Sequence, residues 1–281
     1  MAGSGKKKSS SQPDFATIGG LVLAVGGILA GFMMEGGKIQ EIAQITAALI
    51  VLGGTIGAVM VTTPLSVLIR ASKQFASVVF GKVHPLDETI EEIVEYAGLA
   101  RKNGIVSLEQ QATAIEDPFL SKALNLAVDG IEAHKIREIM ELEITLFEQR
   151  AEAEAKVFEG AGGYAPTIGI IGAVLGLIQV MKNLANIDEV GRGIAVAFVA
   201  TVYGVGSANV FFLPAANKLR ARFQTAVRIK EMMLDGVLCI AEGMNPKLIR
   251  SKLEAYAPAG ARAAKKAPGR GRAEKEAAAE A

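Results

Sequence analysis

The chain lacks most of the residues that mark enzymes and metal sites. Cys239 is the only cysteine among its 281 residues, which excludes an internal disulfide and a cysteine-cluster metal site. His84 and His134 are isolated, and there is no HExxH sequence, no phosphate-binding glycine loop followed by lysine and serine or threonine, and no nucleophile elbow. We therefore expect a protein that is not an enzyme and that holds no metal and no cofactor.

Charge is absent from four long stretches, although the formal net charge of the whole chain is only +1. These stretches are residues 15–34, 42–69, 160–181 and 193–217. Each is long enough for a helix to cross a hydrocarbon core of about 30 Å at about 1.5 Å per residue. Buried helices of a soluble bundle rarely give four such runs, so the sequence predicts four transmembrane helices.

The first run follows a basic N-terminus, MAGSGKKKSSSQPD, that resembles the start of a signal peptide. The run has no clean small-residue cleavage site, so we interpret it as a retained span. Lysine and arginine concentrate before the first run and after the second and fourth, whereas the two short connectors carry only Lys38, Lys182 and Arg192. The positive-inside rule then places both termini in the cytoplasm.

The predicted fold class is all-α, a polytopic membrane protein with four transmembrane helices and a helical cytoplasmic domain. The predicted segments are a basic N-terminus (1–14), a first transmembrane hairpin (15–69, with spans 15–34 and 42–66) and a cytoplasmic helical domain (70–159). They continue with a second hairpin (160–217, with spans 160–181 and 193–216), a cytoplasmic C-terminal helix (218–256) and a disordered tail (257–281). The tail is rich in alanine, glycine, proline and charge, a composition that cannot build a core.

The second hairpin contains many glycines in addition to its bulky apolar residues. Small residues let helix backbones approach closely where lipid removes the hydrophobic drive between helices, so this hairpin is expected to pack against protein. Pro166 and Pro214 each remove a backbone donor, and we expect each to bend its helix at the same membrane depth. Hydroxyls in the second span, such as Thr55 and Thr62, are expected to bond to their own helix rather than to bind ions.

The cytoplasmic domain shows helical patterns. Residues 87–103 carry apolar residues at helical spacing, and Gly104 follows where such a helix would stop. The sequence SLEQ from Ser107 to Gln110 has capping-box spacing and predicts the start of the next helix. Residues 130–160 predict a long amphipathic helix that continues into the third span.

None of the four uncharged runs contains Asp, Glu, Lys, Arg or His. Ionisable residues inside a membrane usually mark an ion or proton path, so this chain alone lacks a group for proton relay. If the chain moves ions, a partner must supply the carboxylate.

Two segments carry a family resemblance. They are ARKNGIVSLE, residues 100–109, and APTIGIIGAVLG, residues 165–176. Found in this order with four spans around them, they resemble the MotA family of flagellar stator subunits, including PomA and MotP, within the wider MotA/TolQ/ExbB group, and the likeness covers residues 15–256. The resemblance implies a homopentamer in the bacterial inner membrane around two copies of a single-span MotB-type partner, in which an aspartate on each partner helix binds the ion. No nucleic acid is implied as a partner.

The resemblance also assigns site residues. Pro166 and Pro214 match the family's two functional prolines, and Thr201 matches a threonine that faces the ion route. From the residues alone, a hydroxyl bonded to its own helix is the simpler reading of Thr201. Sodium-driven relatives resemble Gly-Thr-Leu-Val-Gly where this chain has GAVLG, and Ala173 in that segment offers no oxygen to replace a sodium hydration shell, so protons are favoured over sodium.

In the cytoplasmic domain, Arg101 and Glu109 match the charged pair through which the family engages the rotor protein FliG. Lys102 is adjacent and is expected to share that role. Without the family, these residues are equally well explained as solvated charges at a helix end, where cations interact favourably with the helix dipole.

Two alternatives remain at this point. A TolQ-like or ExbB-like envelope energiser would have three spans and an outer N-terminus, and the fourth uncharged run together with the basic N-terminus argues against it. A membrane scaffold that moves no ion is the second alternative. The partner distinguishes this scaffold from a stator, because the partner of a stator has one span with an aspartate near its start.

Overall fold

The computed structural model describes residues 14–80 and 86–257, and every regular element in that part of the chain is a helix. The predicted all-α class is therefore confirmed. Within the same residues, four helices are long and apolar enough to cross a membrane: Phe15–Met34, Ile45–Thr62, Ala133–Lys182 and Ile187–Ala241. The basic region before Asp14, residues 81–85 with Lys82 and His84, and the predicted disordered tail after Ala257 lie outside the described residues.

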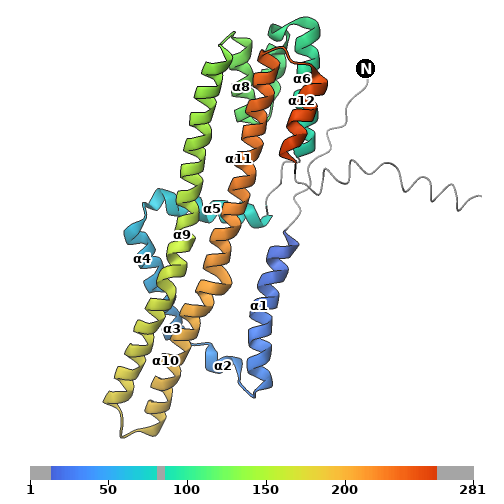
Figure 1. Ribbon diagram of the computed structural model, residues 1–281. Helices are drawn as coiled ribbons and strands as arrows, with labels where there is room; N and C mark the ends of the chain where they lie inside the picture. Colours follow the sequence, from blue (N-terminus) through green and yellow to red (C-terminus); the bar gives the residue numbers. More distant parts are fainter. Residues whose placement is uncertain (1–13, 81–85, 258–281) are drawn as a thin grey trace, which may run out of the picture. The chain divides into compact units, whose positions relative to one another are not determined.

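The chain folds into two compact units. Unit 1 comprises Met1–Lys82 and Glu148–Gln224, and unit 2 comprises Val83–Phe147 and Thr225–Ala281. Two long helices, α9 (Ala133–Lys182) and α11 (Leu213–Ala241), contribute residues to both units (Figure 1).

Unit 1 begins with α1 (Phe15–Met34), whose N-cap Asp14 accepts a hydrogen bond from the Thr17 N–H and which has no buried residue. The short helix α2 (Ile39–Ile42) ends where the second uncharged run begins, and that run then forms α3 (Ile45–Ala48), the π-helix η1 (Leu49–Gly53) and α4 (Gly54–Thr62). This differs from the single span predicted over 42–66, because the backbone is extended at Gln44 and again at Thr63. Pro64 then lacks the N–H that would continue the helix, and the separate helix α5 (Leu65–Phe80) follows.

The second hairpin pairs α9 with α10 (Ile187–Gly206), which lie side by side in Figure 1. Pro166 does not interrupt α9. Pro214 is the second residue of α11, and α11 directly follows the π-helix η3 (Ser207–Phe212). A π-helix widens the turn and so gives room to a proline ring that cannot donate a hydrogen bond.

The C-terminal helix predicted over 218–256 does not start where the fourth span was expected to stop. The fourth span instead continues without a gap through η3 into α11. Gly243, with φ +70°, follows the end of α11 at Ala241. The short helices α12 (Pro246–Leu253) and η4 (Glu254–Tyr256) complete the described chain.

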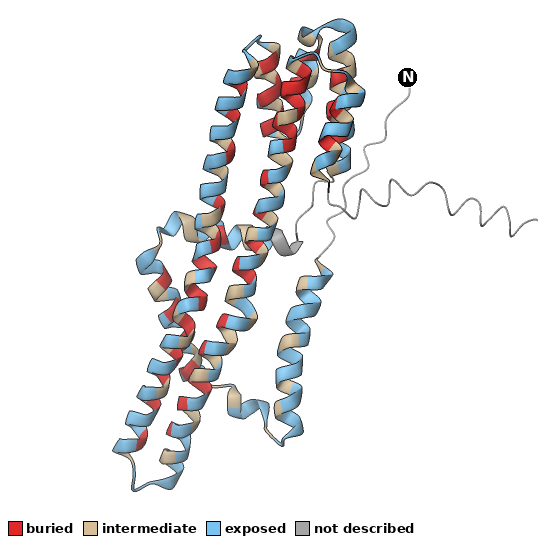
Figure 2. Cartoon of the chain, viewed as in Figure 1, coloured by how far each residue is buried: buried red, intermediate tan, exposed pale blue. Residues whose placement is uncertain are grey.

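Unit 2 is built from short helices around an apolar core. Its remaining elements are α6 (Leu86–Asn103), η2 (Ile105–Leu108), α7 (Glu109–Ala114) and α8 (Pro118–Val128). The core joins residues of α6, α8, α9, α11 and α12, and Figure 2 shows buried positions on these helices. Its large side chains include Phe119, Leu124 and Met140. Gly104, with φ +84°, follows α6, which confirms the predicted stop.

Two details of unit 2 differ from expectation. The capping box predicted at Ser107 is wrong: Ser107 lies inside η2 and its hydroxyl donates to the Gly104 carbonyl at 2.7 Å, while α7 begins at Glu109 without a side-chain cap. Helix α8 was not predicted, although Asp117 caps it by accepting hydrogen bonds from the N–H groups of Phe119 and Leu120.

Candidate functional site

The α9–α10 pair is held together at backbone distance by small residues. A Cβ atom added at Gly204 of α10 would lie 2.6 Å from the Ala165 carbonyl oxygen of α9, and one added at Gly176 of α9 would lie 2.9 Å from the Ala197 nitrogen. Real Cβ atoms do not approach backbone this closely, so only glycine fits at these two positions. The predicted close packing of this hairpin is therefore present within the chain itself.

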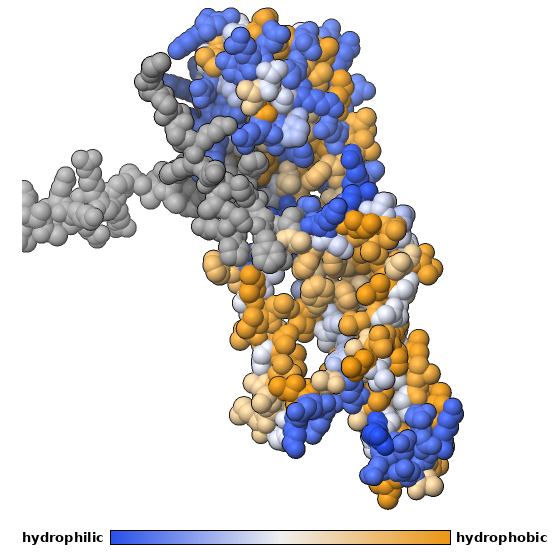
Figure 3. Space-filling model, turned by 180° about the vertical axis from the view of Figure 1, so that it is seen from behind, coloured by the Kyte–Doolittle hydropathy of each residue, from blue (hydrophilic) through white to orange (hydrophobic). Residues whose placement is uncertain are grey.

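The outer faces of the same helices are apolar and exposed. Phe198 on α10 is 71% exposed, and Ile170 and Val174 on α9 are exposed as well. Figure 3 shows apolar side chains over the helices of unit 1. In a membrane these faces are available to lipid, to a partner helix or to another copy of the chain.

The residues predicted for the ion path lie on this hairpin and just beyond it. Pro166 and Ala173 on α9 and Thr201 on α10 are half-buried, whereas Pro214 on α11 is exposed. The Thr201 hydroxyl donates to the Ala197 carbonyl of its own helix at 3.2 Å. This leaves the lone pairs of the Thr201 oxygen as the group that an ion or a water could contact.

Hydroxyls of the second span behave as expected. The fully buried Thr55 donates to the Val51 carbonyl at 2.6 Å, and Thr62 donates to the Val59 carbonyl at 3.1 Å. Both are satisfied by their own helix. Among the described residues, no group of three or more His, Cys, Asp or Glu side chains could hold a metal ion.

Sequence reasoning missed the role of Tyr203, two residues from Thr201. Its hydroxyl donates to the Ile42 carbonyl at 2.6 Å and accepts from the Gln44 N–H at 3.4 Å. These two backbone groups flank the break between α2 and α3, so Tyr203 satisfies polar groups that the break exposes and fixes them to α10. The sequence signal was a lone tyrosine inside an apolar run, which by itself indicates no partner.

A belt of ion pairs ties the helices of unit 1 together outside the uncharged runs. The charge belt comprises Asp14, Arg70, Glu152, Glu154, Glu159, Lys218 and Arg220. Arg220 on α11 donates to Glu152 on α9 from Nη2 at 2.8 Å and from Nε at 3.1 Å, and also to Glu159. Hydrogen bonding from Arg220 lowers the pKa of Glu152.

The other pairs of the charge belt attach α5 and α1. Arg70 on α5 lies 3.4 Å from Glu154 on α9. Lys218 on α11 lies 2.5 Å from Asp14, and its hydrogen bond lowers the pKa of the Asp14 carboxyl to about 2. Ion pairs of the charge belt thus connect α1, α5, α9 and α11.

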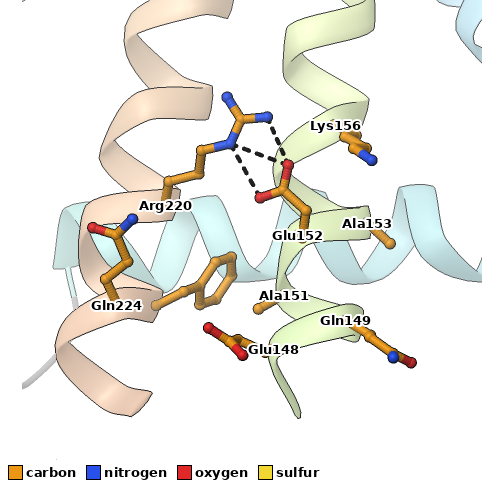
Figure 4. Close-up of a pocket in the computed structure, with 9 residues that line it drawn as sticks. Glu148, Gln149, Ala151, Glu152, Ala153, Lys156, Arg220 and Gln224 are labelled. Carbon is orange, nitrogen blue, oxygen red and sulfur yellow. Dashed lines mark hydrogen bonds and ion pairs between the residues drawn. The ribbon is translucent and has the colours of Figure 1, made fainter. Parts of the chain in front are cut away.

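Next to the Arg220–Glu152 pair is a cavity of about 470 Å³ (Figure 4). Its lining residues are Glu148, Gln149, Ala151, Glu152, Ala153, Lys156, Arg220, Phe223 and Gln224. Figure 4 shows the guanidinium of Arg220 pointing toward the carboxylate of Glu152, and both side chains line the cavity. Because the charged groups of the lining balance in sign, the cavity has no strong preference for an anion or a cation.

The predicted rotor-facing charges are exposed in unit 2. Arg101 and Lys102 lie in the last turn of α6, and Glu109 is the first residue of α7. Each charge has the sign that its helix end favours. Val106, in the short η2 helix between them, is also exposed, so this surface joins both signs of charge to an apolar side chain.

Comparison with known proteins gives a consistent result. The sequence model of the MotA/TolQ/ExbB proton channel family matches residues 111–232, and that of the motility protein A N-terminal region matches residues 18–102. Motility protein A of Bacillus subtilis (strain 168) is 39% identical over 250 residues, which cover 88% of this chain and 92% of the relative. Chemotaxis protein PomA of Vibrio alginolyticus is 33% identical over 250 residues, which cover 89% of this chain and 98% of that protein.

Solved structures agree with the sequence matches. The flagellar MotAB stator complex from Bacillus subtilis superposes with a TM-score of 0.82 at 38% identity, covering 90% of this chain and 99% of the matched chain. MotAB of C. jejuni superposes with a TM-score of 0.84 at 33% identity, covering 88% and 96%. With family matches in both halves and relatives above 30% identity over most of its length, the chain belongs to the MotA/TolQ/ExbB proton channel family, among its motility protein A members.

Proposed function

We propose that this chain is the MotA-type stator subunit of the bacterial flagellar motor, which couples ion flow across the inner membrane to torque on the rotor. One observation carries the mechanism: the tightly packed α9–α10 hairpin contains no Asp, Glu, Lys, Arg or His in its uncharged runs. An ion carrier needs such a group, so the carboxylate is supplied by a second subunit. The structures that this chain resembles are described as MotAB complexes, which supports a MotB-type partner with an ion-binding aspartate.

The proposed assembly is a homopentamer around two partner helices. The exposed apolar faces of α9 and α10 provide surfaces for the partner, and Pro166, Ala173, Thr201 and Pro214 are the proposed residues of the ion route. Protons are the proposed ion because Ala173 offers no side-chain oxygen, whereas proton transfer needs only the partner carboxylate. The relatives named motility protein A favour this function over a TolQ-like or ExbB-like energiser or a passive scaffold.

The proposed orientation places both termini in the cytoplasm. Arg70, Lys73, Lys218, Arg220 and Arg222 follow the second and fourth spans, whereas the short connectors hold few basic residues. Unit 2 is then the cytoplasmic part, and Arg101, Lys102 and Glu109 are its proposed contacts with FliG.

The test is complementation of a stator-less strain with this chain and its partner. We expect swimming that does not depend on external sodium, and we expect Arg101→Glu to abolish most of the torque while membrane levels stay normal. Exposed charges contribute about 0 to 1 kcal/mol to stability, so the substitution spares the fold. Lys135→Glu, at an exposed position of α9 in unit 2, is the matched charge reversal and should leave torque unchanged.

Three outcomes contradict parts of the proposal. Loss of the Arg101→Glu protein from the membrane would indicate a folding role for Arg101. Normal torque would remove it from the rotor contact. Motility that follows external sodium at constant proton-motive force would exclude protons as the driving ion.

A further inference from the structure

Helix α5 (Leu65–Phe80) is amphipathic and follows the second span after a sharp break. Thr63 is extended and Pro64 precedes the first turn, so the chain changes direction between α4 and α5. Figure 1 shows α5 crossing α9 and α11 rather than running along them. A helix that crosses the spans near their end has the orientation of an interfacial helix rather than of a fifth span.

One face of α5 packs on unit 1. Ala71 is fully buried, and the Phe75 ring lies 5.2 Å from the Phe158 ring and 5.4 Å from the Phe211 ring, measured between centroids. Arg70 pairs with Glu154 of α9 at 3.4 Å. These contacts determine which face of α5 packs on unit 1 and at which residues of α9 the helix crosses.

That level coincides with the end of the uncharged runs. Glu154 and Phe158 precede Gly160, the first residue of the third run, by six residues or fewer, or about 9 Å along a helix. Phe211 lies six residues before Asn217, where the fourth run ends. The axis of α5 therefore crosses α9 where apolar side chains give way to the charge belt.

The opposite face of α5 carries an apolar strip beside basic charge. Leu65 and Ile69 are 59% and 46% exposed, and Ala76 continues the same face at helical spacing. Lys73 is exposed beside this strip. The helix sequence contains Arg70 and Lys73 and no acidic residue.

We propose that the exposed face of α5 lies in the headgroup region of the bilayer and binds anionic phospholipid through Lys73. Two observations select the bilayer over a second copy of the chain as the occupant. The strip follows closely in sequence on exposed apolar residues of α4, of which Val61 is 88% exposed. Its rim is only basic, which complements the anionic lipids of the cytoplasmic leaflet. The inference rests on the proposed membrane topology and is independent of ion conduction and of the rotor contact.

The first test measures the depth of α5. The full chain, purified with its partner, carries Cys239→Ser so that a fluorophore can be attached at one introduced cysteine, and the complex is reconstituted in lipid nanodiscs. The label at Ile69→Cys is expected to be quenched most by lipids with a spin label just below the headgroup. Leu23→Cys on α1 serves as the bilayer-interior control and Gln110→Cys on α7 as the aqueous control.

Each other result overturns the proposal. Quenching of the Ile69 label by aqueous iodide, as at Gln110, would place the face in water. Quenching mainly by mid-bilayer spin labels, as at Leu23, would place it in the hydrocarbon core. Protection from all quenchers would show that protein, such as a second copy, covers the face.

The second test measures lipid selectivity at Ala76→Cys by energy transfer to fluorescent phosphatidylglycerol or phosphatidylcholine. We expect phosphatidylglycerol to be enriched about fivefold, the ratio that corresponds to about 1 kcal/mol for one basic side chain at an anionic surface. Lys73→Gln should remove most of this enrichment and Lys73→Arg should retain it. Equal occupancy by the two lipids in the unsubstituted helix would overturn the anionic-lipid site. Because both readouts are made without motility, they fail independently of the stator function.

Discussion

Units 1 and 2 bury different kinds of side chain. In unit 2 most of the fully buried residues are large, among them Phe119, Leu124 and Met140. In unit 1 most buried residues are alanines or glycines, such as Ala200 and Gly204, while many large apolar side chains are exposed. Figure 2 shows both buried and exposed positions along the helices of this unit. The two halves of this protein therefore follow different packing rules.

The difference follows from the solvent that each unit meets. Water drives large apolar side chains of unit 2 into a core. Lipid is as apolar as leucine, so helices in it associate through close backbone contact, which small residues permit. Truncating a buried side chain should then be the costly change in unit 2, and enlarging a small one should be the costly change in unit 1.

The largest effect on stability is expected for Phe119→Ala in unit 2. Phe119 is 1% exposed, and the Lys230 ammonium lies 4.3 Å above its ring. Emptying such a site costs about 3 to 5 kcal/mol. Hydrogen exchange of the full chain in detergent should show faster exchange in α8 and α6.

The matched control for that change is Leu23→Ala in α1. Leu23 is 76% exposed, and a truncation there should change stability by less than about 0.5 kcal/mol. Equal effects of Phe119→Ala and Leu23→Ala would mean that the two units do not differ in what stabilises them.

An intermediate effect is expected for Gly204→Ala in unit 1. The new methyl group would lie 2.6 Å from the Ala165 carbonyl oxygen and 3.0 Å from the Gly169 Cα, and neither backbone atom can move away cheaply. Such overpacking costs about 1 to 3 kcal/mol. The melting temperature of the detergent-solubilised protein should fall.

Gly206→Ala, two residues further along the chain, is the control. Nothing lies within 4 Å of a Cβ atom at Gly206, and alanine has the higher helix propensity by about 1 kcal/mol. This variant should be neutral or slightly more stable. Equal melting temperatures of Gly204→Ala and Gly206→Ala would mean that the close approach of α9 and α10 does not require glycine at position 204.

The elements that sequence reasoning predicted depend on local pattern. The uncharged runs predicted the spanning helices, and Gly104 predicted the end of α6. The amphipathic spacing before Gly160 predicted that α9 continues into the third span. Helix α8 carried an equally local signal in Asp117-Pro118 that was not used. The capping box failed because Ser107 lies inside η2, so that Leu108 and not Ser107 is the residue that precedes the first turn of α7.

The features that could not be predicted depend on residues distant in sequence. The break at Gln44 is stabilised by Tyr203, 159 residues away, and Arg220 reaches Glu152 over 68 residues. No local pattern indicates such partners. The proposed ion and rotor residues were assigned by family resemblance, because a solvated or helix-bonded group explains each of them equally well from composition and spacing.

The smallest effects on stability are expected for single polar contacts. One such contact in unit 1 should be lost in acid, and one in unit 2 should be lost in base. In unit 1, the lowered pKa of Asp14, about 2, means that its pairing with Lys218 stabilises the fold above about pH 4 and is lost as pH falls toward 2. In unit 2, the Tyr256 hydroxyl donates to Asp235 at 2.7 Å, and burial together with this bond raises the Tyr256 pKa. The unfolded tyrosine ionises near pH 10, so this contribution is present below that pH and is lost as pH rises above it.

Substitutions separate the two contacts. Tyr256→Phe should cost about 1 kcal/mol at neutral pH, the typical value of one hydrogen bond, and its melting temperature should approach that of the unsubstituted chain above about pH 10. Asp14→Asn should differ from the unsubstituted chain at neutral pH and approach it only in acid, because protonation of Asp14 removes the same charge that the substitution removes. Thermal unfolding of both variants across pH tests this; a Tyr256→Phe difference that stayed constant through pH 10 would show that the Asp235 contact does not depend on the tyrosine proton.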